Sequence, residues 1–259
     1  MSSAPDLPED FHTHGLWPDQ ASLVPIPALS TAQTAIEEAI EAGGMTCLHG
    51  DAGIGKTLAA SLALRTTAHE QTIWPRFRVS PTARNLREEL FRALPLDGPV
   101  PRRPAEVDSL LHEALACRRH VLVFDDMQYL NADCLRLIRS LWDDRDIHNR
   151  PAVVFIGDRR GYEKLRKELA ARMYTWHQID RLGADEVRTA MPAFHPEWAK
   201  VPLHLIDEAD AYGPRGRMRS WVQLTKHCLR GMQRFGKDRI DEPLLRWALE
   251  RAFGFPEDR

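Results

Sequence analysis

One eight-residue segment limits what this chain can fold into more than any other feature. Residues 50–57 read Gly-Asp-Ala-Gly-Ile-Gly-Lys-Thr, which fills the phosphate-binding pattern G-x-x-x-x-G-K-[S/T]. A short apolar run at 45–49 precedes the segment, and residues 57–68 have the pattern of a helix. Because this pattern binds phosphate where a strand passes into a helix, the segment predicts an α/β fold.

Each residue type in the loop has a chemical use. Glycines let backbone N–H groups close around phosphate oxygens, and the start of the following helix adds a favourable dipole. Lys56 supplies positive charge to the outer phosphates, and the Thr57 hydroxyl can ligate magnesium. The expected cofactors are therefore ATP and Mg2+. The predicted nucleotide-binding residues of the loop are Gly50, Asp51, Ala52, Gly53, Ile54, Gly55, Lys56, Thr57 and Leu58.

A second motif follows at residues 121–126, which read Val-Leu-Val-Phe-Asp-Asp. The apolar run is typical of a strand buried on both faces of a parallel sheet. Asp125 is the expected acid on the magnesium side, and Asp126 is the candidate base that orients the attacking water. Two adjacent carboxylates beside phosphates are costly without a cation, so the pair itself favours magnesium.

The rest of the chain alternates between strand and helix patterns up to about residue 182, which predicts a parallel sheet with right-handed crossovers. Further strands are expected at 72–79, 152–156 and 174–179, with Pro75 demoting the first toward a sheet edge. Further helices are expected at 30–42, 82–94, 105–118, 131–142 and 161–171, and then, without strands, at 183–191, 202–211, 215–231 and 241–253. The predicted parts are an irregular segment 1–29, a nucleotide-binding domain 30–182 and a helical lid domain 183–259.

The composition limits the kinds of partner and cellular compartment that we expect for the protein. The 259 residues have a formal net charge of −2, so any nucleic acid must be bound by a local basic patch rather than by a global positive field. The four cysteines form no CxxC pair, which argues against a zinc knuckle and fits a reducing compartment. No apolar stretch approaches the roughly 20 residues of a membrane span. We expect a cytoplasmic protein with no membrane partner.

Taken together, residues 50–57 and Asp125-Asp126-Met127-Gln128-Tyr129-Leu130 resemble the AAA+ ATPases. More narrowly, they are similar to the branch that contains the transposition regulators TnsC, TniB and MuB and the ExeA-type ATPases. That branch often has Asp-Glu-Ala-Gln-x-Leu at the second motif, whereas this chain has Asp126 in place of the glutamate. The side chain is one methylene shorter, so the resemblance implies ATP hydrolysis that is slow or uses a shifted water.

The resemblance implies further site residues. Asp158 follows the strand at 152–156, where the family usually has a polar sensor, commonly asparagine. Arg172 stands where the family has an arginine finger, although an arginine that complements a helix C-terminus explains it as well. Arg217 looks like the second sensor and fits the spacing better than Arg215; the alternative is a solvated basic helix start.

The resemblance also implies DNA contacts in the segment after the second strand. Short polar and arginine side chains there can hold phosphates without reading sequence, although a solvated basic face is the plainer interpretation. The candidates are Thr82, Arg84, Arg87, Arg102 and Arg103. His12 and His14 have metal-like spacing but no nearby partners in the sequence, and we assign them no ligand role.

The favoured hypothesis is an ATPase that assembles on double-stranded DNA as a ring or helical filament of identical subunits. It would bind DNA without sequence specificity and regulate transposition by recruiting a transposase. A second hypothesis is an ExeA-like or signalling ATPase that acts on a protein partner without DNA. A third is a replication or helicase-loading factor.

Overall fold

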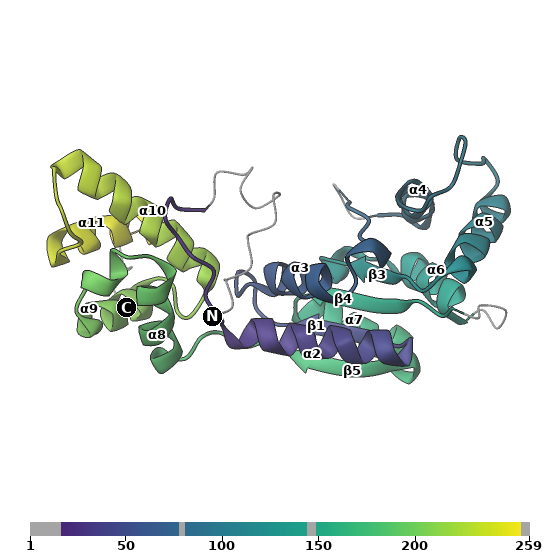
Figure 1. The fold of residues 1–259 in the computed structure, drawn as a ribbon, viewed down its shortest axis with the longest axis horizontal. Helices are drawn as coiled ribbons and strands as arrows, with labels where there is room; N and C mark the ends of the chain where they lie inside the picture. The colour runs from purple at the N-terminus through teal and green to yellow at the C-terminus, as the bar shows by residue number, and fades with distance from the viewer. Residues whose placement is uncertain (1–16, 78–80, 144–148, 255–259) are drawn as a thin grey trace. The chain divides into compact units, whose positions relative to one another are not determined.

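The computed structural model describes residues 17–77, 81–143 and 149–254 (Figure 1). The first part of the predicted irregular segment 1–29, with His12 and His14, lies outside the described residues. So do the last two residues of the strand predicted at 72–79.

Within the described residues, five parallel strands form one sheet in the order β2-β3-β4-β1-β5. The predicted parallel α/β sheet is therefore confirmed. The strand bounds are β1 Met45–His49, β2 Thr72–Ile73, β3 Val121–Phe124, β4 Ala152–Gly157 and β5 Met173–Gln178.

Helices connect these strands and flank the sheet (Figure 1). The first begins at Pro27 and not at the predicted Ser30, because a proline is well suited to the first turn, where no N–H partner is needed. The helices of this part are α2 Pro27–Ala42, α3 Lys56–Thr67, α4 Ala83–Ala93, α5 Pro104–Cys117, α6 Ala132–Asp143 and α7 Arg159–Leu169, with short 3-10 turns η1 His69–Gln71, η2 Met127–Tyr129 and η3 Ala170–Arg172.

The strand β2 is much shorter than predicted. It pairs with β3 only at Thr72 and Ile73, and it lies at the edge of the sheet. Residues 74–77 have no strand structure. Pro75 has no N–H to donate to a ladder, which accounts for both the edge position and the early end of the strand.

The three inner strands β3, β4 and β1 are buried almost throughout because they are apolar, whereas β5 at the sheet edge is partly exposed. Phe124 and Phe155 are fully buried on neighbouring strands, and their rings stack 5.6 Å apart. Leu86 and Leu90 of α4 and Leu111 of α5 belong to the same core. The hydrophobic effect thus fixes the strands whose ends carry the polar motifs.

A second core lies among the helices after residue 180. Trp198 and Trp221 are fully buried there, with their rings edge to face at 5.1 Å. The indole N–H of Trp198 donates to Thr225 at 2.8 Å, which satisfies its polar atom. The elements of this part are α8 Ala184–Phe194, η4 Trp198–Lys200, α9 Leu203–Tyr212, α10 Met218–Phe235 and α11 Glu242–Phe253.

The described chain divides into two compact units. One contains residues 31–51 and 56–179, and the other contains the described residues up to 30, residues 52–55 and the described residues from 180 onward. The segment before α2 packs on the helical core, since Trp17 meets Phe194 edge to face at 5.4 Å and the N–H of Ser22 donates to the Phe194 carbonyl at 2.8 Å. The predicted domain limits at residues 29 and 182 stay predictions. In the parts of the chain that the structure describes, no helix is both long enough and apolar enough to span a bilayer.

Replacing Phe155 with alanine should lower the free energy of unfolding by about 3–5 kcal/mol, because it leaves a cavity against Phe124 in the centre of the sheet. Urea unfolding followed by circular dichroism measures the change. Tyr129→Ala is the control, since that ring is 56% exposed and its loss should change the stability by less than about 0.5 kcal/mol. A Phe155→Ala variant as stable as the control contradicts the assignment.

Candidate nucleotide site at the carboxyl edge of the sheet

Three neighbouring strands build the candidate site. β1 leads into the loop 50–55, β3 leads into Asp125, and β4 leads into Asp158. Since β4 lies between β3 and β1 and all three are parallel, their carboxyl ends meet at one edge of the sheet. In open α/β sheets this edge is where ligands bind.

The loop has the backbone geometry that its glycines allow. Gly53 and Gly55 have φ angles of 82° and 101°, in the region that side chains disfavour. Helix α3 begins directly after the loop, at Lys56, and its first turn holds no acidic residue. The ammonium of Lys56 donates to the carbonyls of Gly50 at 2.9 Å and Asp51 at 2.6 Å. A helix N-terminus and a buried cation therefore lie together, an arrangement that attracts anions.

The first residue of α3 after the lysine contacts the second motif. The Thr57 hydroxyl donates a hydrogen bond to the carboxylate of Asp125. The backbone N–H of Asp126 donates to the same carboxylate at 2.8 Å. Burial nevertheless raises the pKa of Asp125, because the ionised carboxylate loses its water and the hydrogen bonds offset this only in part.

The Thr57 hydroxyl and the Asp125 carboxylate are the hard oxygen donors that magnesium prefers. Magnesium in phosphate sites is usually held by one or two protein oxygens together with substrate phosphates and waters. The donor set of Thr57 and Asp125 fits that description, and the raised pKa of Asp125 shows a carboxylate whose charge a cation would stabilise. Among the described residues, no group of three or more His, Cys, Asp or Glu side chains is arranged to hold a metal.

Asp126 occupies a turn that depends on one glutamine. Its φ angle of 51° is uncommon for a residue other than glycine. Its carboxylate accepts a hydrogen bond from the side-chain amide N–H of Gln128 at 2.8 Å. The amide oxygen of Gln128 in turn accepts from the backbone N–H of Asp158 at 3.3 Å. Gln128 therefore joins the candidate base to the end of β4.

The turn η2 is fastened from two further sides. Lys164 of α7 donates to the carbonyls of Gln128 and Leu130, both at 2.7 Å. Gly157 leaves room for the turn, since a Cβ atom there would lie 2.5 Å from the Gln128 side-chain oxygen and 2.6 Å from a Met127 carbon. Lys164 lies in a basic stretch of the sequence, but its ammonium is hydrogen-bonded to this turn.

Two predicted catalytic residues have structural partners. The Asp158 carboxylate caps α7 by accepting from the N–H of Gly161 at 3.0 Å. The Arg172 guanidinium donates to both oxygens of Asp143, at 2.7 and 2.8 Å. Hydrogen bonding to Arg172 lowers the pKa of Asp143. Their assigned roles as sensor and finger stay predictions.

The loop residues 52–55 fall in the same compact unit as the helices from residue 180 onward, which we call the helical unit. The backbone N–H of Arg219 donates to the Gly53 carbonyl at 2.9 Å, and the aliphatic part of the Arg219 side chain lies beside Gly53. Arg217, the predicted second sensor, is the N-cap residue of α10. Arg219 is not among the site residues predicted from the sequence, because this helix was expected to begin at residue 215, whereas α10 begins at Met218 and has Arg219 in its first turn.

Four of the five predicted DNA-binding residues have partners within the same unit. Thr82 caps α4, Arg84 pairs with Glu88 at 2.9 Å, and Arg103 lies 3.5 Å from Glu106. Arg87 of α4 is mostly buried and makes a bidentate pair with Asp108 of α5, at 2.6 and 2.9 Å. Arg102 is exposed.

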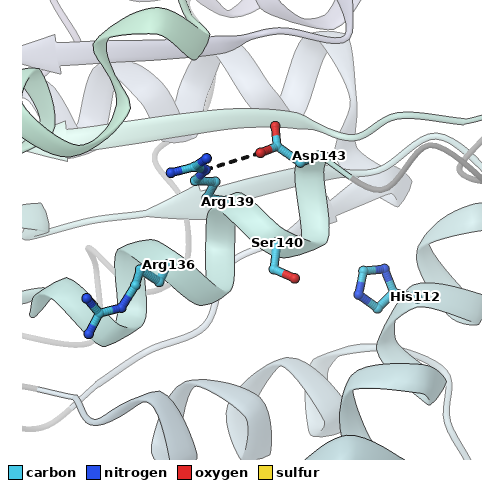
Figure 2. A pocket seen from close by; sticks show the side chains of 5 residues that line it. All are labelled: His112, Arg136, Arg139, Ser140 and Asp143. Carbon is cyan, nitrogen blue, oxygen red and sulfur yellow. Dashed lines mark hydrogen bonds and ion pairs between the residues drawn. The ribbon is translucent and has the colours of Figure 1, made fainter.

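A separate surface pocket of about 610 Å³ lies between α5 and α6 (Figure 2). Its lining residues are His112, Arg136, Arg139, Ser140 and Asp143. Figure 2 shows Arg139 reaching the Asp143 carboxylate, which is also the partner of Arg172. None of the predicted site residues lines this pocket.

Replacing Asp125 with asparagine should make the nucleotide-free protein more stable at neutral pH, because the substitution removes a buried charge. A carboxyl group whose folded pKa is raised favours the folded state only while protonated, and this contribution is lost as the pH rises through the folded pKa. The advantage of Asp125→Asn should therefore shrink as the pH falls.

Urea unfolding at neutral and acidic pH, without nucleotide or magnesium, measures the difference. Asp97→Asn, at an exposed position, is the control and should change the stability by less than about 0.5 kcal/mol at either pH. An Asp125→Asn variant that is less stable than wild type at neutral pH contradicts the prediction.

Comparisons with known proteins agree with this geometry. Residues 39–165 match the family model of the AAA domain. No curated protein matches the sequence at a significant level. Cdc6p from Pyrobaculum aerophilum shares the fold with a TM-score of 0.72 and 16% identity, over 93% of this chain and 72% of that one. The ORC1 protein of Aeropyrum pernix in complex with DNA matches with a TM-score of 0.68 and 18% identity, over 91% of this chain and 68% of that one. The RuvB Holliday junction branch migration motor of Thermotoga maritima matches with a TM-score of 0.59 and 18% identity, over 98% of this chain and 76% of that one.

The narrower resemblance to transposition regulators stays a prediction. The family match covers the loop 50–57, both aspartates of the second motif and Asp158. The fold match extends over the helices that follow. The chain carries an AAA domain over residues 39–165 and is a P-loop ATPase with the AAA+ fold.

Proposed function

We propose that the protein binds ATP with magnesium and assembles, in an ATP-dependent way, on double-stranded DNA. The contact of Thr57 with Asp125 beside the Lys56 ammonium supports the nucleotide part most strongly. Lys56 holds the outer phosphates, while Thr57 and Asp125 hold the magnesium ion, which neutralises phosphate charge when bound.

In this proposal, Asp126 orients the attacking water and Gln128 is its positioning residue. The amide N–H of Gln128 holds one oxygen of the Asp126 carboxylate, which leaves the other oxygen to accept from water. An aspartate reaches one methylene less far than the glutamate of the resembling family. The hydrogen bonds around this turn already fix the direction of the Asp126 carboxylate, so less conformational entropy is lost when it orients a water molecule. This smaller entropy cost offsets part of the rate lost through the shorter side chain.

The DNA part of the proposal draws on the relatives. ORC1 was solved in complex with DNA, and RuvB is named as a Holliday junction branch migration motor. Head-to-tail contacts between identical subunits build a ring or a helical filament. A neighbouring subunit's Arg172 would then reach the nucleotide only after leaving Asp143. From the resemblance stated above, the assembly recruits a transposase and so regulates transposition.

Two alternatives accompany this proposal, and the first has specific support. The pairing of Arg84, Arg87 and Arg103 with carboxylates favours an ATPase that acts on a protein partner without DNA, since these cations are already neutralised. The third hypothesis, a replication or helicase-loading factor, stays a prediction. Binding of duplex DNA separates the first of these from the main proposal.

Wild-type protein should form rings or filaments on duplex DNA only with ATP, as seen by electron microscopy and gel shifts. Lys56→Ala should lose ATP binding and assembly, because it removes the only side-chain cation of the loop. Lys167→Ala, an exposed lysine of α7, is the matched control and should behave as wild type. Retained ATP binding in Lys56→Ala rejects the site, and no nucleotide-dependent assembly by wild type rejects the DNA function.

Two variants of Gln128 should lower kcat on the order of tenfold to a hundredfold while the KM for ATP stays constant, because only the water-orienting group is displaced. Gln128→Glu keeps the acceptor for the Asp158 N–H but cannot donate to Asp126, whereas Gln128→Met removes both bonds at similar length. Steady-state ATPase assays measure both, with Tyr129→Ala as the control in the same turn. Unchanged kcat in both variants, or a rise in KM that accounts for the loss, disproves the positioning role.

A further inference from the structure

Charge is unevenly distributed among the helices of the helical unit. α8 and α9 together contain five acidic residues and one arginine. α10 contains four Lys or Arg residues and no Asp or Glu over its 18 residues. A helix with this composition lacks the intrahelical ion pairs that usually neutralise a solvated face.

The cations of α10 follow the helical period. Arg219, Lys226, Arg230 and Arg234 recur at intervals of seven, four and four residues, with Gln223 between the first two. All lie on one face, which we call the basic face of α10. Arg219, Arg230 and Arg234 are exposed. The face is about 22 Å long, which corresponds to roughly six base pairs of duplex DNA.

Neither Arg230 nor Arg234 forms an ion pair with a carboxylate within the described residues. Three of the four arginines predicted from sequence to touch DNA differ in this respect, because Arg84, Arg87 and Arg103 each pair with a carboxylate. A cation that is already hydrogen-bonded to a carboxylate must break that pair before it can hold a phosphate. The basic face of α10 is therefore better prepared to bind a polyanion than the face of α4 and α5.

Two further observations show that positive charge and aromatic rings lie together near the C-terminal half of α10. The pKa of His227 is lowered by burial and by the nearby charges of Arg230, Arg251 and Lys226. At the end of the helix, the exposed ring of Phe235 packs edge to face with Trp247 of α11 at 5.2 Å. Arg234 and Arg251 lie over these two rings, at 5.6 and 5.7 Å. The rings hold both guanidinium groups in place without neutralising them.

The basic face begins at the residue that contacts the phosphate loop. Arg219 donates its backbone N–H to the Gly53 carbonyl, so the first turn of α10 and the loop are bonded directly. A change in the loop on nucleotide binding would act on the end of the same helix. This bond gives a physical route by which ATP could bias the exposure of the face.

We propose that the basic face of α10, with Arg251 of α11 beside it, is a docking surface for the phosphate backbone of duplex DNA. The proposal rests on the DNA-binding function proposed above and assigns that function to a different part of the chain from the one that the sequence suggested. The proposed contacts are to phosphates and carry no sequence information.

Fluorescence anisotropy of labelled duplex DNA with the full chain and ATP, at several salt concentrations, tests the proposal. The variant Arg230→Gln/Arg234→Gln should weaken binding on the order of tenfold per side chain at about 0.1 M salt, and should reduce the slope of log affinity against log salt by about 2. Both positions are exposed, so folding should be unaffected, which circular dichroism and ATP binding check.

The matched control is Arg136→Gln/Arg159→Gln, which removes the same charge from exposed arginines of the other unit and should leave the salt slope unchanged. A third variant, Arg84→Gln/Arg103→Gln, tests the face of α4 and α5. If Arg230→Gln/Arg234→Gln binds DNA with the affinity and salt slope of wild type, the basic face is not the docking surface, and the proposed function is unaffected. Wild type that binds no duplex DNA, including one that binds only an acidic peptide, overturns both.

Discussion

The adjacency of β3, β4 and β1 is the constraint on which the candidate site depends. Parallel pairing brings the phosphate loop, Asp125 and Asp158 to one edge, although Asp125 lies 68 positions and Asp158 lies 101 positions after Thr57, the last residue of the loop. The apolar strands are held by burial, and Phe124 and Phe155 pack in the centre. The energy that positions the polar groups therefore comes from the core, while the polar groups themselves are costly to bury. Asp125 shows this cost in its raised pKa.

The turn after β3 shows how the structure accommodates local strain. A positive φ at a residue other than glycine costs on the order of 1–3 kcal/mol and persists only where the surroundings determine it. Asp126 is surrounded by such determinants: a glutamine that holds its carboxylate, a lysine that holds two carbonyls of the turn, and Gly157, which leaves space for the turn to pack. Several weak interactions thus fix one direction of one carboxylate, which is the requirement of a group that orients water.

The arginines illustrate that the charge of a side chain says little about its availability. Arg172, Arg87 and Arg230 are equivalent in a count of positive residues. In the structure the first holds Asp143, the second holds Asp108, and the third lies exposed on a helix without acids. Only the third retains an uncompensated charge within the described residues, and long-range attraction of a polyanion depends on such charges.

The sequence alone determined the loop, the two aspartates and the parallel α/β fold, because a local glycine pattern and buried apolar runs depend mainly on neighbouring residues. It also identified the edge position of β2 through Pro75. The tertiary structure decided what distant residues do: that Gln128 joins Asp126 to Asp158, that Arg219 rather than Arg217 contacts Gly53, and that the arginines of α4 are paired. These facts depend on where helices begin and which side chains meet across elements. The phosphate-binding segment could be recognised from the sequence, but its contacts with Asp125 and Arg219 could not. Such hydrogen bonds between distant residues require the packed core to bring the residues together.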